Sequence, residues 1–259
     1  MGMILTLALC AASLAAGDLD PADELPLPPE GKQFRLVWND EFDGTELDET
    51  KWEVPPDAPR RDGWWMRQAI TLDGRGHLVI STLKDGDRYV DGCVRTRGKF
   101  EHAFGYYVAR IRLQSEPGHW PAFWLYNHCE GNIGNGGVDG AEIDIMEKPW
   151  LDGRVNHAIH WDGYGAEHQS EGKVADVAGL MDGYHTYALW WSPTDYVFYI
   201  DGQETWRTRA GGICREPLYI KLSDEIGTWG GDIGAANLPD SFLVDYVRVY
   251  DMVDAGPAE

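Results

Sequence analysis

The chain has 259 residues, 43% of them hydrophobic, and its 43 acidic and 22 basic side chains give a net charge of −21. Such a length and apolar content suffice for one large domain with a substantial core. The negative field excludes nucleic acid and anionic membrane surfaces as partners, because both would be repelled. It also disfavours heavily sulfated polysaccharides unless the few basic residues gather in a cleft. A neutral polymer is the better match, although the charge could equally serve solubility.

The chain begins with an apolar run, Met1–Ala16, that ends in small residues. Ser13-Leu14-Ala15 supplies a cleavage context typical of a secretory signal peptide, and the run is too short to anchor in a bilayer. We therefore predict a signal peptide at residues 1–16, a secreted or periplasmic location and no membrane insertion. An acidic, Pro-rich lead-in at residues 17–33 precedes one domain at residues 34–252.

Short runs of alternating apolar residues, rich in β-branched and aromatic side chains, dominate the rest of the chain. Turn residues such as Asp201-Gly202 separate them, and no 3.6-residue periodicity is sustained. This pattern predicts an all-β sandwich or jelly roll. The clearest predicted strands are His77–Thr82, Tyr106–Leu113, Val155–Trp161, Thr186–Trp191, Tyr196–Asp201 and Phe242–Tyr250.

Aromatic residues are abundant, with twelve Trp and twelve Tyr. A sugar ring has apolar C–H faces on which an exposed indole can stack, although any single Trp more often belongs to the core. Trp120 is a good cleft candidate, because it follows Gly118-His119 and precedes Pro121 at the entrance to a strand. The predicted sugar-binding residues of this type are Trp65, Trp120, Trp124, Trp161 and Trp229.

Three carboxylates lie on one short apolar strand, Ala141–Pro149, which reads A-E-I-D-I-M-E-K-P. Side chains alternate faces along a strand, so Glu142 and Asp144 point to one side and the two isoleucines to the other. Glu147 breaks this alternation by one residue. A β-bulge, marked by Met146, would absorb the extra residue and return Glu147 to the face of Glu142.

An acidic strand of this kind is often only a solvated face. Crowded like charges, however, repel one another and raise a pKa, which is costly for a purely structural strand. Retaining glycosidases place two carboxyl groups roughly 5–5.5 Å apart on opposite sides of one glycosidic bond. Because Glu142 and Glu147 could lean toward each other, their spacing suits a nucleophile and a general acid/base.

Two histidines on the next predicted strand invite a metal interpretation, since H-x-x-H can chelate from a helix. Residues three apart on a strand face opposite sides, so His157 and His160 would not share a zinc ion. We favour His160 for the carboxylate face, with a hydrogen-bonded structural histidine as the alternative.

Three cysteines, Cys93, Cys129 and Cys214, remain once the leader is removed. In an exported protein they allow one disulfide plus a free thiol, or three unpaired thiols. Their spacing matches no metal motif. The sequence does not determine their pairing, and we expect a monomer.

Together these segments resemble glycoside hydrolase family 16, the laminarinase-like β-jelly-roll enzymes, over most of Phe34–Tyr250. The decisive part is E-I-D-I-M-E, which resembles the longer, bulged E-x-D-x-x-E form of the family, whereas lichenase-type members carry a shorter form. The other matching segments are Val37–Trp52, Val94–Arg110, Gly118–Trp124 and Val244–Tyr250.

The resemblance implies roles for individual residues. Glu142 would be the nucleophile, Glu147 the general acid/base, and Asp144 the neighbour that orients Glu142 and shares its proton. These roles agree with the chemistry, since a nucleophile must be ionised and a general acid must hold its proton until the leaving oxygen needs it. Trp120 and Trp124 would lie near the cleavage point, with His160 on the neighbouring strand.

The family often holds a structural calcium ion, and the resemblance implies Glu41, the Gly76 carbonyl and Asp245 as its ligands. Calcium prefers such oxygen ligands, and no cofactor is required for catalysis. Two features depart from the family pattern. Val108 stands where a carboxylate is common, and Gly131–Gly140 is unusually rich in glycine.

We therefore predict an exported retaining endo-β-glucanase that hydrolyses β-1,3- or mixed β-1,3/1,4-glucan by double displacement. The resemblance implies a concanavalin-like jelly roll with a concave cleft and a glycoside hydrolase domain at residues 34–252. Alternatives on the same fold are a galactan hydrolase of the agar or carrageenan type and a transglycosylase. A glucan-binding module without catalysis is a further alternative, which the presence of all three acids disfavours.

Overall fold

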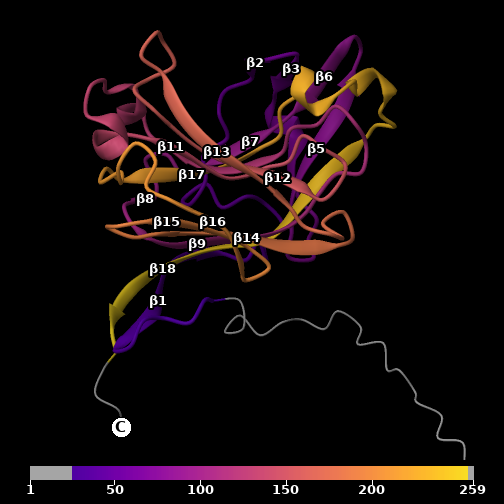
Figure 1. Cartoon of the computed structure of the whole chain (residues 1–259). Coiled ribbons are helices and arrows are strands. Elements are labelled where there is room, and N and C mark those ends of the chain that lie inside the picture. Colours follow the sequence, from indigo (N-terminus) through magenta and orange to yellow (C-terminus); the bar gives the residue numbers. More distant parts are fainter. Residues whose placement is uncertain (1–24, 256–259) are drawn as a thin grey trace, which may run out of the picture.

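Two packed β-sheets make up the computed structural model, which describes residues 25–255 (Figure 1). The prediction of an all-β sandwich is confirmed. The predicted signal peptide and the first part of the lead-in lie outside the described residues. Across residues 25–255, none of the helices has the length and apolar character needed to cross a membrane.

An eleven-stranded sheet has the order β16-β15-β14-β9-β18-β5-β6-β3-β2, with β1 paired to β18 and β4 to β5. Its strands β9, β14, β15 and β16 form the lower layer in Figure 1, whereas β2, β3 and β6 lie at the top. The long strand β18 joins its parts, because β1, β5 and β9 all pair with it. The strands are β1 Lys32–Asp40, β2 Ala58–Arg60, β3 Gly63–Trp65, β4 Ile70–Leu72, β5 Leu78–Asp85, β6 Arg88–Asp91, β9 Gly105–Arg112, β14 Tyr184–Trp191, β15 Tyr196–Ile200, β16 Gln203–Thr208 and β18 Asp240–Asp254.

A seven-stranded sheet forms the upper layer, in the order β13-β12-β11-β10-β17-β7, with β8 paired to β17. All its pairings are antiparallel. Its strands are β7 Cys93–Arg95, β8 Glu101–His102, β10 Ala122–Tyr126, β11 Glu142–Glu147, β12 Arg154–Trp161, β13 Gln169–Asp176 and β17 Leu218–Ser223. Short 3-10 helices lie in the loops: η2 Arg67–Ala69, η3 His128–Gly131, η4 Gly136–Asp139, η5 Thr228–Gly230 and η6 Ile233–Ala235.

The hydrophobic core lies between the two sheets. Ile143 and Ile159 enter it from the smaller sheet, and Tyr107 and Phe198 enter it from the larger one. Because side chains alternate along a strand, the opposite face of the smaller sheet is left for polar and aromatic residues. We call this the open face. The three described cysteines are unpaired, which decides between the two alternatives that their number allowed.

Replacing Ile159 by alanine tests this division of faces. Ile159 is fully buried on the core side of β12, so Ile159→Ala should lower the free energy of unfolding by about 2–4 kcal/mol, through lost burial and a cavity. Urea unfolding of the variant measures the change. Val174→Ala on the neighbouring strand β13, where the side chain is 45% exposed, is the control and should change stability by less than about 0.5 kcal/mol.

Candidate active site

The three acids of β11 lie on the open face because the strand is bulged. Glu142 pairs with His160 and Asp144 with Ala158 on β12, but the next pair is Glu147 with Asn156. Ile145 and Met146 therefore stand opposite His157 alone, and both are fully buried in the core. The extra residue is absorbed by this bulge, as the sequence predicted, and Glu147 returns to the face of Glu142 and Asp144.

A hollow of about 300 Å³ lies over these acids on the open face. Strands β10, β11 and β17 form its floor, and the β2–β3 hairpin, at the top of Figure 1, lies at its edge. The lining residues are Arg60, Arg61, Trp120, Ala122, Trp124, Glu142, Asp144, Glu147, Ser223 and Glu225.

Glu147 is held from two sides. It accepts a hydrogen bond from Trp120 Nε1 at 2.9 Å and another from Asn156 Nδ2 at 2.8 Å. Burial, together with the nearby Asp144 charge, raises the pKa of Glu147 to about 8, although the two hydrogen bonds oppose this shift. A carboxyl group with such a pKa is protonated at neutral pH and can donate its proton to a leaving group.

Glu142 and Asp144 form a close pair of acids. Burial raises the pKa of both groups, and the Asp144 charge raises the pKa of Glu142 further. Two carboxyl groups in such proximity share protons, so one can be ionised while the other is neutral. The Tyr164 hydroxyl donates a hydrogen bond to Glu142 Oε1, which favours the ionised form of Glu142.

The two histidines of β12 face opposite sides, as predicted from their spacing. His157 is buried on the core side, bonded to the Ile145 carbonyl and the Thr205 hydroxyl, and burial lowers its pKa to about 4. His160 Nε2 lies 3.3 Å from Asp144 Oδ2 on the open face. In the part of the chain that the structure describes, one group of three His, Cys, Asp or Glu side chains is close enough together to hold a metal ion. It consists of Glu142, Asp144 and His160.

Of the predicted aromatic residues, Trp120 and Trp124 line the hollow. Trp229 packs edge-on against Trp120, with ring centroids 4.7 Å apart. Trp65 is not among the lining residues, and its Nε1 donates to the Asp224 carbonyl at 2.8 Å. Trp161 is placed differently, since its ring packs against Gly211 and the hydrophobic core.

Three basic residues and a tyrosine at the hollow were not among the predicted site residues. Arg60 and Arg61 both bind Glu225, and Lys221 lies over the Trp124 ring. The alternation in the strand L-Y-I-K-L-S could have predicted Lys221, because it puts Lys221 and Ser223 on the same face. Tyr164 lies in a loop, where no periodicity indicates a direction.

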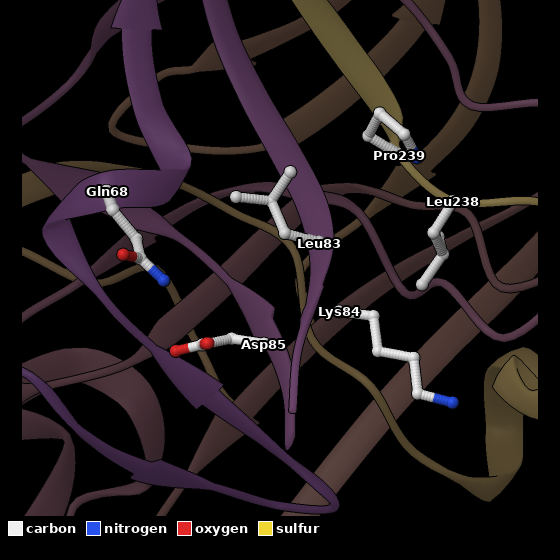
Figure 2. A pocket seen from close by; sticks show the side chains of 6 residues that line it. All are labelled: Gln68, Leu83, Lys84, Asp85, Leu238 and Pro239. Atoms are coloured by element: carbon white, nitrogen blue, oxygen red, sulfur yellow. The ribbon is translucent and has the colours of Figure 1, made fainter. Parts of the chain in front are cut away.

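A larger hollow of about 710 Å³ lies elsewhere, between β5 and the Leu238-Pro239 segment (Figure 2). Its lining residues are Gln68, Leu83, Lys84, Asp85, Leu238 and Pro239. A single carboxylate and a single amine provide neither a pair of acids nor an activated nucleophile. This hollow therefore lacks the groups that the hollow over β11 provides.

The residues that the resemblance implied for calcium are engaged with arginines. Glu41 forms a bidentate pair with Arg248 at 2.7 and 2.8 Å, and Asp245 binds Arg110. Carboxylates neutralised in this way do not provide the free oxygen ligands that calcium needs. These two side-chain carboxylates are therefore engaged elsewhere, while the backbone carbonyl of Glu41 and the side chain of Asp43 lie beside Gly76. The calcium site stays a prediction.

A model of the glycosyl hydrolases family 16 matches residues 61–247. The keratan-sulfate endo-1,4-β-galactosidase of Sphingobacterium multivorum is 31% identical over 85% of this chain and 56% of that protein. The β-glucanase of Rhodothermus marinus is 29% identical over 91% of this chain and 89% of that protein. The crystal structure of laminarinase from Flavobacterium sp. UMI-01 has a TM-score of 0.71 and 26% identity, covering 84% of this chain and all of that one. The chain spans 39% and 56% of the length of two of its curated relatives.

The raised pKa of Glu147 predicts a pH-dependent cost to stability. Its folded value of about 8 lies above its ordinary value of 4.5, so the folded state binds the proton more tightly and loses stability as the pH rises from about 4.5 to 8. Glu147→Gln carries no charge and avoids this loss. Its melting temperature should match that of the parent at pH 4.5 and exceed it at pH 8, as measured by calorimetry. Glu204→Gln, at an exposed residue, is the control, and an equal response of both variants would contradict the prediction.

Proposed function

The chain belongs to glycosyl hydrolase family 16, and from this premise we propose that it is a retaining endo-glycosidase that hydrolyses a β-linked polysaccharide. The observation that carries the proposal is the bulge of β11, because it brings Glu142 and Glu147 to one hollow. Burial raises the pKa of both Glu142 and Glu147 to about 8, but Glu142 can share its proton with the adjacent Asp144. An acid that holds its proton and a carboxyl group that can be ionised, on one hollow, are the groups that glycoside hydrolysis requires.

In the first step Glu142 acts as the nucleophile. Its carboxylate attacks the anomeric carbon and forms a glycosyl ester, while Glu147 gives its proton to the leaving oxygen. Asp144 takes part by sharing a proton with Glu142. The hydrogen bonds from Trp120 and Asn156 hold the Glu147 carboxyl group in one orientation, which this transfer needs.

In the second step Glu147 acts as a base. It removes a proton from a water molecule that attacks the anomeric carbon, and Glu142 is released. Two successive displacements at one carbon retain its configuration. A transglycosylase would differ only in that a second sugar replaces this water.

For the substrate we propose a β-1,3- or mixed β-1,3/1,4-glucan, which is supported by the similarity to a β-glucanase and a laminarinase. A galactan is the second candidate. It is favoured by the similarity to a keratan-sulfate endo-1,4-β-galactosidase and by the basic residues at the hollow. The apolar run at residues 1–16 supports an enzyme that meets such a polymer outside the cytoplasm.

Azide rescue separates the roles of the two glutamates. Glu147→Ala should lose at least about 10²-fold in kcat, as expected for the loss of a general acid/base. With an aryl glycoside, whose leaving group needs no proton, azide should restore activity and give the β-glycosyl azide. Glu142→Ala should instead give the α-azide, because no ester forms. The opposite pairing of products would reverse the assignment.

A polysaccharide panel tests the substrate. The purified protein should release oligosaccharides from laminarin or lichenan, and NMR of the first product should show the β-anomer. Agarose and carrageenan are the comparison. Release from these galactans alone would favour the second candidate, and an α-anomer would refute double displacement.

A further inference from the structure

Trp120 connects the acid/base glutamate to the protein behind the hollow. Its Nε1 atom donates to Glu147 at 2.9 Å, so the position of the indole contributes to the orientation of that carboxyl group. Trp229 packs edge-on against the indole, and the guanidinium carbon of Arg61 lies 4.1 Å from the ring centroid. The orientation of Glu147 therefore depends on the groups that fix the main chain of Trp120.

The side chain of Asp224 is one of these groups. Its Oδ1 atom accepts a hydrogen bond from the Trp120 amide at 3.1 Å, and the Glu225 carbonyl accepts a second one from the same amide at 2.8 Å. Asp224 directly follows β17 and is fully buried. Its Oδ2 atom accepts from the Thr82 hydroxyl of β5 at 2.6 Å. Burying a carboxylate is costly unless it is hydrogen-bonded and paired with a cation.

His119 is the cationic partner of Asp224. Side chains alternate along an extended chain, so Trp120 points to the open face while the preceding His119 is buried behind it, with 4% of its surface exposed. The His119 Nδ1 atom lies 3.0 Å from Asp224 Oδ2. Burial lowers the pKa of His119, but the hydrogen bond to Asp224 and the surrounding negative charges raise it above its ordinary value. These charges belong to Asp224, Asp240 and Glu116.

Two consecutive residues thus bind one carboxylate, Trp120 through its main chain and His119 through its ring. An isolated β-bridge between His119 and Ile226 keeps the two segments side by side. Neither His119 nor Asp224 is among the residues that line the hollow, so neither contacts a substrate held there. Their connection to Glu147 passes through Trp120.

We propose that His119 and Asp224 are positioning residues for acid catalysis. The ion pair between them fixes Trp120, and Trp120 in turn directs the Glu147 carboxyl group at the leaving oxygen. This inference rests on the proposed function, because it concerns the same proton transfer. No atom of the ion pair takes part in the reaction.

The alternative is that the ion pair only stabilises the fold. In that case the loss of His119 would lower the fraction of folded enzyme and slow the cleavage of every substrate by the same factor. A misplaced Glu147 would instead slow those substrates whose leaving group needs its proton. The dependence of the rate on the leaving group therefore separates the two explanations.

The test compares laminaritetraose with the dinitrophenyl β-glycoside of laminaribiose, or the agaro-oligosaccharide counterparts if the polysaccharide panel favours a galactan. For His119→Leu we expect kcat/KM to fall about 10- to 100-fold for the oligosaccharide, because a small displacement of a catalytic group is this costly. For the dinitrophenyl glycoside it should fall less than about threefold, since dinitrophenolate leaves without a proton.

His185→Leu is the matched control. His185 also pairs with an aspartate, Asp201 at 2.7 Å, but it lies on β14 of the larger sheet and does not line the hollow. The ratio of its two rates should equal that of the parent. His119→Asn retains an N–H donor near the position of Nδ1 and should recover part of the lost ratio. If His119→Leu does not fold in thermal unfolding, this variant and Thr82→Val, which removes a donor to Asp224, replace it.

A second measurement does not require activity. The hydrogen bond from Trp120 favours the ionised form of Glu147, so its loss should raise the pKa of Glu147 further. The gain in melting temperature that Glu147→Gln provides at pH 9 should then be larger by about 2–4 °C in the His119→Leu background than in the parent. In the His185→Leu background the gain should be unchanged.

Equal losses on both substrates in His119→Leu would overturn the proposal and assign the ion pair to the fold. An unchanged gain from Glu147→Gln would also overturn it. A parent protein that cleaves none of these substrates would refute the proposed function instead. The melting comparison would still test the link from His119 to Glu147 in that case, so the two failures are distinguishable.

Discussion

The site depends on keeping three carboxyl groups together on one buried strand. Glu142, Asp144 and Glu147 repel one another, and burial penalises the charge of each. Their positions are maintained because the other face of β11 is anchored in the core by Ile143, Ile145 and Met146, all fully buried. Core packing thus stabilises an arrangement that electrostatics alone would disrupt, and the raised pKa values that result are the property acid catalysis needs.

Around these acids, the open face has regions of different charge. On the β12 side, Asn156 and His160 approach the carboxyl groups. On the β17 side, Lys221 lies with the arginines of the β2–β3 hairpin. A substrate in the hollow therefore meets acids at its centre and cations at one edge. Net charge averages over the whole surface, so it does not describe the field that such a substrate meets locally.

The strands were predictable because local rules determine them. Period-2 alternation predicted β9, β12, β14 and β15 to within two residues at each end. It also placed His157 and His160 on opposite faces. Period-2 alternation does not specify what a side chain contacts at the end of a strand. Trp161, the last residue of β12, is an example. Trp161 packs against Gly211, a residue 50 positions away in the chain, so its surroundings depend on tertiary packing.

The sequence by itself determined the all-β class, the three acids and the bulge, because each follows from the spacing of residues within one short segment. Only the tertiary structure decided what surrounds them. Arg60, Trp65 and Lys221 come from segments more than 150 residues apart and meet because the β2–β3 hairpin packs beside β17. Glu41 and Asp245 likewise form ion pairs with arginines that are distant in the chain, Arg248 and Arg110. Long-range packing determines these partners, and the sequence pattern within a single strand does not specify them.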